Sequence, residues 1–154
     1  MKNNVYLCTM ANKTTSSSIY ESLARMILPE GILDLFEVTN VEEEHTGIIV
    51  ETGLELRIIH IHLAERDLRD KEWHDLAPNG FTEAKCINDF PIRDHKVVLH
   101  VSRRRWLDQE GKSVILPHDS LTAPNTRYSK EFAGVLKKIF GYLPHTGPLS
   151  GAIL

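Results

Sequence analysis

The chain has 154 residues, of which 42% are hydrophobic and 25% charged, and its formal net charge is −3. This length suits one domain with a buried core, and the composition is ordinary for a folded globular chain. No apolar run approaches the roughly 20 residues of a membrane-spanning helix, and two cysteines are too few for a disulfide framework.

The start of the chain and its cysteine content favour a cytoplasmic protein with no membrane partner. Residues 1–10 carry one lysine and a very short apolar patch, too little for a secretory signal. Cys8 and Cys86 lie far apart in the sequence and could form neither a disulfide framework nor a cysteine-rich metal site. This favours a reducing compartment. The sequence leaves open whether the chain starts at Met1 or at Met10.

Charge is divided unevenly along the chain. Residues 1–90 carry eight Lys or Arg against sixteen Asp or Glu, whereas residues 91–140 carry ten against five. A basic segment of this kind indicates where a polyanion would bind. The acidic half could equally neutralise the basic half within the fold.

The front of the chain is predicted to be a flexible lead, residues 1–17, followed by helix. Ser18 with Glu21 has capping-box spacing, and Ile19, Leu23 and Ile27 then repeat at helical intervals. A proline at position 29 ends this helix.

A second helical turn is expected over residues 32–36, and an acidic turn from Val41 to Glu44. Two strands follow, over residues 47–53 and 54–63. The alternation changes parity inside the second of these strands, which predicts a bulge near Ile58 and Ile59.

Residues 65–73 are predicted to form a charged connection, and residues 78–80 a turn. Strands over residues 83–92 and 95–101 are expected on either side of Arg93-Asp94. A hairpin turn at Gly111 then leads into residues 113–116.

The last predicted element is a helix from about Ser129, with an apolar stripe on one face and lysines in its last turn. The stripe contains Phe132, Val135, Leu136, Ile139, Phe140 and Leu143. The sequence therefore predicts one α+β domain over residues 18–143, with a flexible tail over residues 144–154. Its antiparallel sheet with a hairpin is flanked by an N-terminal helix and a C-terminal amphipathic helix.

The arginine block, Arg103, Arg104 and Arg105, follows directly on the strand at 95–101, and Trp106 comes next. Arginine suits phosphate contact, and an aromatic ring beside it suits base contact. Alternation would put Arg103 and Arg105 on the apolar face, where unpaired guanidinium groups are costly. Either the sheet ends at Val101 and all three are exposed, or acidic residues of the front half pair with them. Trp106 is interpreted first as a core residue.

Further cations flank this block. Arg93 and Lys96 precede it, and Arg127 and Lys130 lie near the last helix together with its two lysines. These helix cations indicate either an ordinary solvated face or contacts that position phosphates.

Two histidines, His60 and His62, stand two residues apart on a predicted strand, a spacing that metal sites use. No third ligand follows nearby in the sequence, although His100, His118 and Asp119 could approach in space. The favoured interpretation is a row of imidazoles on the exposed face of the sheet, with no metal or cofactor.

Signatures of covalent catalysis are lacking in the sequence. Cys86 and Ser120 stand in no recognisable nucleophile motif, and the glycines form no phosphate-binding loop.

A family resemblance is carried by five segments of the chain. They are Leu28–Phe36 (LPEGILDLF), Ile87–Arg93 (INDFPIR), Lys96–His100 (KVVLH), Arg103–Trp106 (RRRW) and Thr126–Ala133 (TRYSKEFA). Together, over about residues 24–142, they resemble the N-terminal region of ISAon-type bacterial insertion-sequence transposases.

In related transposases a similar strand-and-arginine block belongs to a small zinc ribbon that precedes a helix-turn-helix and a catalytic domain. Here the place of the ribbon's cysteines holds Leu107 to Glu110, and the chain has no Cys-x-x-Cys. The resemblance therefore does not carry zinc over to this chain, and we predict a hairpin whose turn is formed by Gly111 without metal.

The resemblance implies that this region holds the element's terminal DNA during DNA transposition, while a DDE-type catalytic part lies elsewhere. We therefore expect a non-catalytic chain. Its expected DNA-binding residues are Arg103, Arg104, Arg105 and Trp106, helped by Arg93, Lys96, Arg127 and Lys130.

Two other functions stay open at this point. The acidic front half or the terminal apolar stripe could dock a separately encoded DDE-type catalytic chain. Alternatively, His60 and His62 could form the site of a small metal-dependent enzyme. The sequence leaves open which DNA is recognised, whether the chain is a working subunit or a remnant, and whether copies of it assemble.

Overall fold

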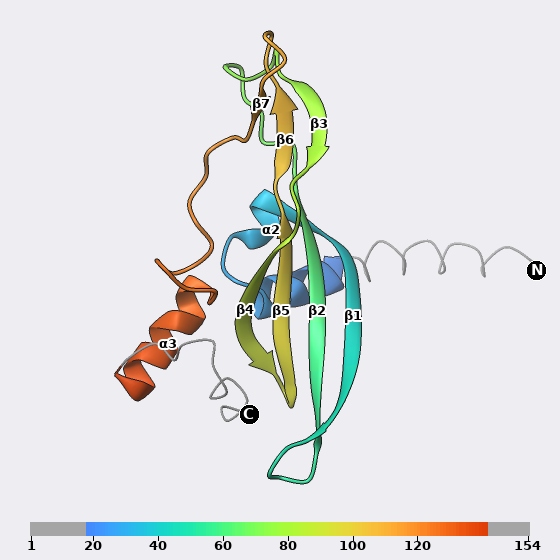
Figure 1. Cartoon of the computed structure of the whole chain (residues 1–154), viewed down its shortest axis with the longest axis vertical. Coiled ribbons are helices and arrows are strands. Elements are labelled where there is room, and N and C mark those ends of the chain that lie inside the picture. Colours follow the sequence, from blue (N-terminus) through green and yellow to red (C-terminus); the bar gives the residue numbers. More distant parts are fainter. Residues whose placement is uncertain (1–17, 142–154) are drawn as a thin grey trace, which may run out of the picture.

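Two β-sheets arranged along the long axis form the frame of the molecule (Figure 1). The structure is a computed structural model that describes residues 18–141, so the predicted lead and tail lie outside the described residues. The larger sheet has the order β1-β2-β5-β4 and the smaller the order β3-β6-β7. The larger sheet contains β1 (Phe36–Ile49), β2 (Glu55–Glu65), β4 (Lys85–Ile92) and β5 (His95–Ser102). The smaller contains β3 (Ala77–Phe81), β6 (Arg104–Leu107) and β7 (Ser113–Val114).

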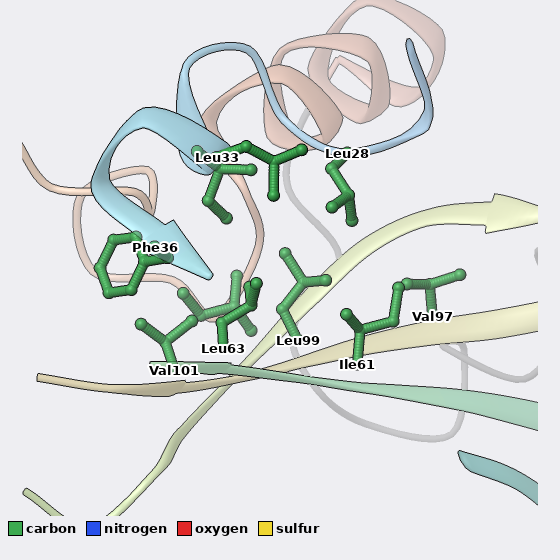
Figure 2. Close-up of a cluster of buried hydrophobic side chains, with 10 residues drawn as sticks. Leu28, Leu33, Phe36, Ile61, Leu63, Val97, Leu99 and Val101 are labelled. Atoms are coloured by element: carbon green, nitrogen blue, oxygen red, sulfur yellow. The ribbon is translucent and has the colours of Figure 1, made fainter. Parts of the chain in front are cut away.

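Helices cover one face of the larger sheet and one of its edges. A helix over residues 18–27 leads into α2 (Ile32–Leu35), and α3 (Lys130–Phe140) lies beyond β4 (Figure 1). Figure 2 shows side chains of residues 28–36 facing those of β2 and β5 across the core. The predicted α+β class, with an N-terminal and a C-terminal helix, is confirmed.

The first helix forms where it was predicted, but its apolar stripe does not face the core. Ile19, Leu23 and Ile27 are exposed, and the contacts with the core come instead from Ala24 and Leu28. Helical spacing correctly predicts the helix, while the direction in which it lies on the sheet depends on residues distant in sequence.

One strand pair departs from the predicted antiparallel sheet. β2 and β5 run parallel at the centre, while β1–β2 and β4–β5 are antiparallel. After β2 the chain first builds β3 and then returns as β4 at the edge, so β5 enters the sheet in the direction of β2. Parallel neighbours need a long crossover of this kind.

The predicted acidic turn at Val41 to Glu44 is wrong, because these residues lie inside the long edge strand β1. Pairing with β2 overrides the weak strand preference of glutamate. Charges on an edge strand also discourage pairing with other chains.

The predicted bulge is also wrongly placed. β2 pairs with β5 in continuous register from Arg57 to Ala64, and the irregularities lie on β1, at Thr39 and between His45 and Ile49. A central strand hydrogen-bonds on both sides, so a bulge there would disturb two ladders, whereas an edge strand disturbs only one.

The predicted turn at residues 78–80 is part of β3 instead. Pro78 tolerates this position because β3 is an edge strand. Gly80 has φ 70°, and the register shifts between Pro78 and Phe81, so the expected turn residues form a bulge.

The hairpin and the last helix agree with the sequence. β6 and β7 are antiparallel, and Gly111 adopts φ 77° in the turn between them. Ser129 caps α3 by accepting a hydrogen bond from the Phe132 backbone N–H, and Gly141 ends the helix at φ 73°. The predicted apolar stripe is only partly confirmed: Leu136 is buried and Phe132 half-buried, whereas Val135, Ile139 and Phe140 are exposed, and Leu143 lies outside the described residues.

None of the helices within residues 18–141 is both long and apolar enough to cross a membrane.

Candidate nucleic-acid interface

The arginine block lies at the junction of the two sheets. β5 ends at Ser102 and β6 starts at Arg104, so Arg103 occupies the gap between two strands. Its backbone N–H donates to the Thr82 hydroxyl, and its carbonyl accepts from the Thr82 N–H at 2.8 Å. Hydrogen bonds between the Arg103 backbone and Thr82 therefore hold the junction independently of the guanidinium groups.

A buried carboxylate, Glu65 at the end of β2, holds Arg103 in place. The Arg103 Nε donates to Glu65 Oε1 at 3.0 Å, and a second guanidinium nitrogen donates to the Leu116 carbonyl. Glu65 is only 2% exposed, so it requires such partners. Of the two alternatives that the sequence left open for Arg103, the structure has the pairing with an acid of the front half, so this guanidinium is already partly occupied.

The second arginine, Arg104, is attached to the same glutamate through its backbone. Its N–H donates to Glu65 Oε2 at 2.7 Å, and its Nε donates to the Glu65 carbonyl at 3.2 Å. The guanidinium carbon lies 4.7 Å from the centre of the Phe81 ring. No carboxylate within residues 18–141 forms a salt bridge with this half-buried guanidinium, which is fixed in position but keeps its charge.

The third arginine, Arg105, is exposed on β6. No salt bridge or hydrogen bond of its side chain occurs within the described part of the chain. A guanidinium nitrogen lies 4.0 Å from the place where a Cβ on Gly80 would be. Of the three arginines, Arg105 has the head group most open to a ligand.

The predicted contact residue Trp106 is part of the interior. It is 2% exposed, and the Arg69 guanidinium carbon lies 4.2 Å from the centre of its ring. Arg69 is held in turn by Asp67, through contacts of 3.0 and 2.7 Å, and this arginine lowers the pKa of the Asp67 carboxyl. The covered indole cannot stack on a base, so Trp106 does not belong to a DNA-binding surface, and its interpretation as a core residue is confirmed.

The remaining predicted cations do not gather around the arginine block. Arg93 lies in the turn between β4 and β5, with φ 59°, and Lys96 is half-buried on β5, where burial lowers its pKa. Arg93 and Arg105 are separated by almost the whole β5–β6 ribbon, about 40 Å at the rise of an extended strand. Arg127 and Lys130 are exposed beside β4. The cations therefore form separate groups along the molecule.

Sequence reasoning missed Glu65, the residue that organises the block. The signal was present, because Glu65 continues the alternation of Ile59, Ile61 and Leu63 and so occupies a core-facing position. A charged residue in phase with buried ones requires a cationic partner. Only the pairing of β2 with β5 identifies that partner as the arginine that follows β5.

The histidines on β2 lie on the half-covered face of the larger sheet, opposite the core. They share one face as the sequence predicted, but their rings are half-buried rather than exposed. His100 on β5 does approach them: its ring stacks on His62 with centroids 4.5 Å apart. His118 lies at the opposite face, where its ring packs edge-on against Phe36 at 5.6 Å, with its Nε2 3.3 Å from Glu65 Oε1 but without hydrogen-bond geometry. In the described residues no three such side chains are placed to hold a metal ion.

Comparison with known proteins adds no relative. No protein-family model, curated protein or solved structure matches the chain.

Proposed function

We propose that this chain is the non-catalytic, DNA-binding N-terminal region of an insertion-sequence transposase. The proposal rests on the resemblance of its five segments to ISAon-type transposases and on the chemistry at the sheet junction. The observation that carries it is that Arg104 and Arg105 keep their charge unpaired by any carboxylate within residues 18–141, while Glu65 neutralises Arg103.

In this proposal the three arginines have different roles. Arg103 positions the strand junction and touches no DNA. Arg104 and Arg105 donate charge-assisted hydrogen bonds to phosphate oxygens, from a strand whose backbone is already ordered. Because Arg104 is held by its backbone and by Phe81, little conformational entropy is lost when phosphate binds.

The proposed interaction is electrostatic and largely independent of DNA sequence. Arg93, Lys96, Arg127 and Lys130 add weaker contacts along the molecule. Each phosphate contact releases counterions, so affinity falls steeply as salt rises. Base contacts by Trp106 are not part of the proposal, because its ring is covered.

The test is fluorescence anisotropy of the full chain with a labelled duplex that carries the element's terminal repeat, at several salt concentrations. We expect Arg104→Ala with Arg105→Ala to weaken binding and to reduce the salt slope by about one per lost contact. Lys137→Ala with Lys138→Ala is the matched control, because it removes two exposed cations of α3. Equal losses in both double variants, or unchanged binding in the first, would contradict the assignment of the site.

A second candidate function is docking of a separately encoded DDE-type catalytic chain. It is favoured by the exposed apolar side chains of the helix over residues 18–27, where Met26 is 83% exposed. Apolar residues grouped on one exposed helix are typical of interaction sites. Co-purification of the catalytic chain that is abolished by Leu23→Glu with Met26→Glu, together with no DNA retention by this chain alone, would favour docking over DNA binding.

A further inference from the structure

A hydrogen-bonded row of side chains crosses all four strands of the larger sheet on its half-covered face. Glu44 Oε2 on β1 lies 2.7 Å from His60 Nε2 on β2. His60 Nδ1 lies 2.8 Å from His100 Nε2 on β5. His100 Nδ1 lies 3.5 Å from the Cys86 sulfur on β4, and Cys86 is exposed.

The row has a direction because a carboxylate can only accept hydrogen bonds. Where the carboxylate of Glu44 accepts from His60 Nε2, a His60 ring with a single proton carries it on Nε2 and accepts at Nδ1. His100 must then donate from Nε2, and its Nδ1 becomes an acceptor in turn. The Cys86 thiol is the remaining donor. The assigned tautomers therefore place a basic imidazole nitrogen against the S–H group.

The surroundings keep His100 in the form that can accept a proton. Burial, and then the neighbouring His62 and His60, lower the pKa of His100, so its ring is neutral at neutral pH. His62 stacks on the ring, and Glu42 lies 3.8 Å from His62. The titratable and charged groups that face the row from its strands are Glu42, Glu44, His60, His62, Cys86 and Lys96.

We propose that Cys86 is an activated thiol that reacts with small disulfides, with His100 as its general base and with His60 and Glu44 as positioning residues. A nucleophile, a base and the groups that orient the base are linked by successive side-chain contacts here, as in nucleophilic sites. The proposal is independent of DNA binding, because the row is on a different sheet from Arg105 and shares no residue with the arginine block.

The reaction is a thiol–disulfide exchange. The Cys86 S–H proton moves to His100 Nδ1, and the thiolate attacks one sulfur of the disulfide. The S–S bond of the small molecule breaks, and a new S–S bond to Cys86 forms. The departing thiolate takes the proton from His100. Cys86 is oxidised to a mixed disulfide, and one half of the small disulfide is reduced to a thiol.

The proposed reaction requires that a disulfide can reach the Cys86 sulfur. Cys86 is exposed near the start of β4, and its in-register neighbour on β5 is His100. A small disulfide can therefore reach the sulfur without opening the core, which lies on the other face of the sheet.

The test uses the full chain with Cys8→Ser, so that Cys86 is the single thiol, and the neutral disulfide 4,4′-dithiodipyridine as probe. Reaction rates are followed by thiopyridone absorbance from pH 5 to 9. We expect the folded chain to react faster at pH 7 than the same chain unfolded in urea. His100→Gln should slow the reaction about tenfold, because the thiol loses the group that accepts its proton.

Glu44→Gln and Glu43→Gln form a matched pair that does not depend on His100→Gln folding. Both are partly exposed residues of β1, but Glu43 pairs with Arg57 and His95 on the opposite face. Glu44→Gln should slow the reaction and flatten its rise at low pH, whereas Glu43→Gln should leave it unchanged. Circular dichroism checks the fold of each variant.

Mass spectrometry after incubation with glutathione disulfide should find the mixed disulfide on the Cys86 peptide. A folded chain that reacts no faster than the unfolded one overturns the proposal. So does a folded His100→Gln variant that reacts as fast as its parent.

Discussion

Two carboxylates among residues 18–141, Glu65 and Asp89, are buried, and they are accommodated in different ways. Glu65, at the junction of the sheets, accepts hydrogen bonds from the Arg103 side chain and the Arg104 backbone. Asp89, on β4, accepts from the Ser129 hydroxyl at 2.6 Å, and no cation pairs with it within residues 18–141. Accordingly, burial raises the pKa of Asp89, and the Ser129 hydrogen bond only partly counteracts it.

The difference teaches what each carboxylate does for the fold. Glu65 joins β2 to the start of β6 and fixes how the smaller sheet leaves the larger one. Asp89 joins β4 to the start of α3, because the same hydroxyl that bonds it also caps the helix. One is part of an ion pair, the other part of a helix cap, and their responses to mutation and pH should differ.

The largest effect is expected from Glu65→Ala. The substitution leaves Arg103 half-buried without its carboxylate and removes the acceptor of the Arg104 N–H. Loss of one partner of a buried pair costs about 3 kcal/mol or more in the free energy of unfolding. Urea denaturation measures this change. Glu43→Ala, which removes a partly exposed carboxylate, should cost under about 1 kcal/mol, and an equal loss in both variants would mean that Glu65 has no special role.

A smaller effect is expected from Ser129→Ala. The variant loses the N-cap of α3 and leaves Asp89 without its hydroxyl donor, so we expect a loss of about 1–2 kcal/mol in unfolding free energy. Ser120→Ala is a control with a partly buried hydroxyl in the loop before α3. Hydrogen exchange should show the loss of protection concentrated in α3. Protection of the α3 amides equal to that in the parent protein would contradict a capping role.

The smallest effect is expected from Asp89→Asn, and it depends on pH. Because the pKa of Asp89 is raised in the folded state, the folded chain binds this proton more tightly than the unfolded chain. The Asp89 contribution to stability therefore falls as pH rises from the ordinary aspartate pKa through the raised one. Asparagine removes this pH-dependent contribution, so the stability of the variant relative to the parent should increase as pH rises through this acid range. Thermal unfolding from pH 3 to 7 measures the difference, and parallel curves for the two proteins would contradict it.

Much of the fold could be read from local patterns. The alternation in residues 54–63 and 95–101, the turn at Gly111 and the helical spacing after Ser129 each predicted an element that the structure contains. These signals lie within a few residues of one another and depend on backbone geometry alone. The histidine face of the sheet was predictable for the same reason, since side chains two residues apart on a strand share a face.

The errors occurred where a distant partner overrides local preference. Three consecutive glutamates in β1 are poor strand formers, yet the edge of a sheet accommodates them. Pro78 and Gly80 are turn residues by composition, but pairing with β6 makes them part of a strand. For the candidate DNA site, the sequence left open whether the three arginines are exposed or paired with acids, and in the structure Arg103 is paired, Arg104 is fixed and Arg105 is exposed.

Local sequence patterns were thus sufficient to predict the class of fold, most of the strands and the segments that carry charge or imidazole rings. It could not predict the parallel contact of β2 with β5, which brings Glu65 to Arg103 and His60 to His100. Those contacts join residues about 40 positions apart, and their geometry depends on how a crossover returns to the sheet. Which charges remain open to a ligand is therefore decided only when the strands have paired.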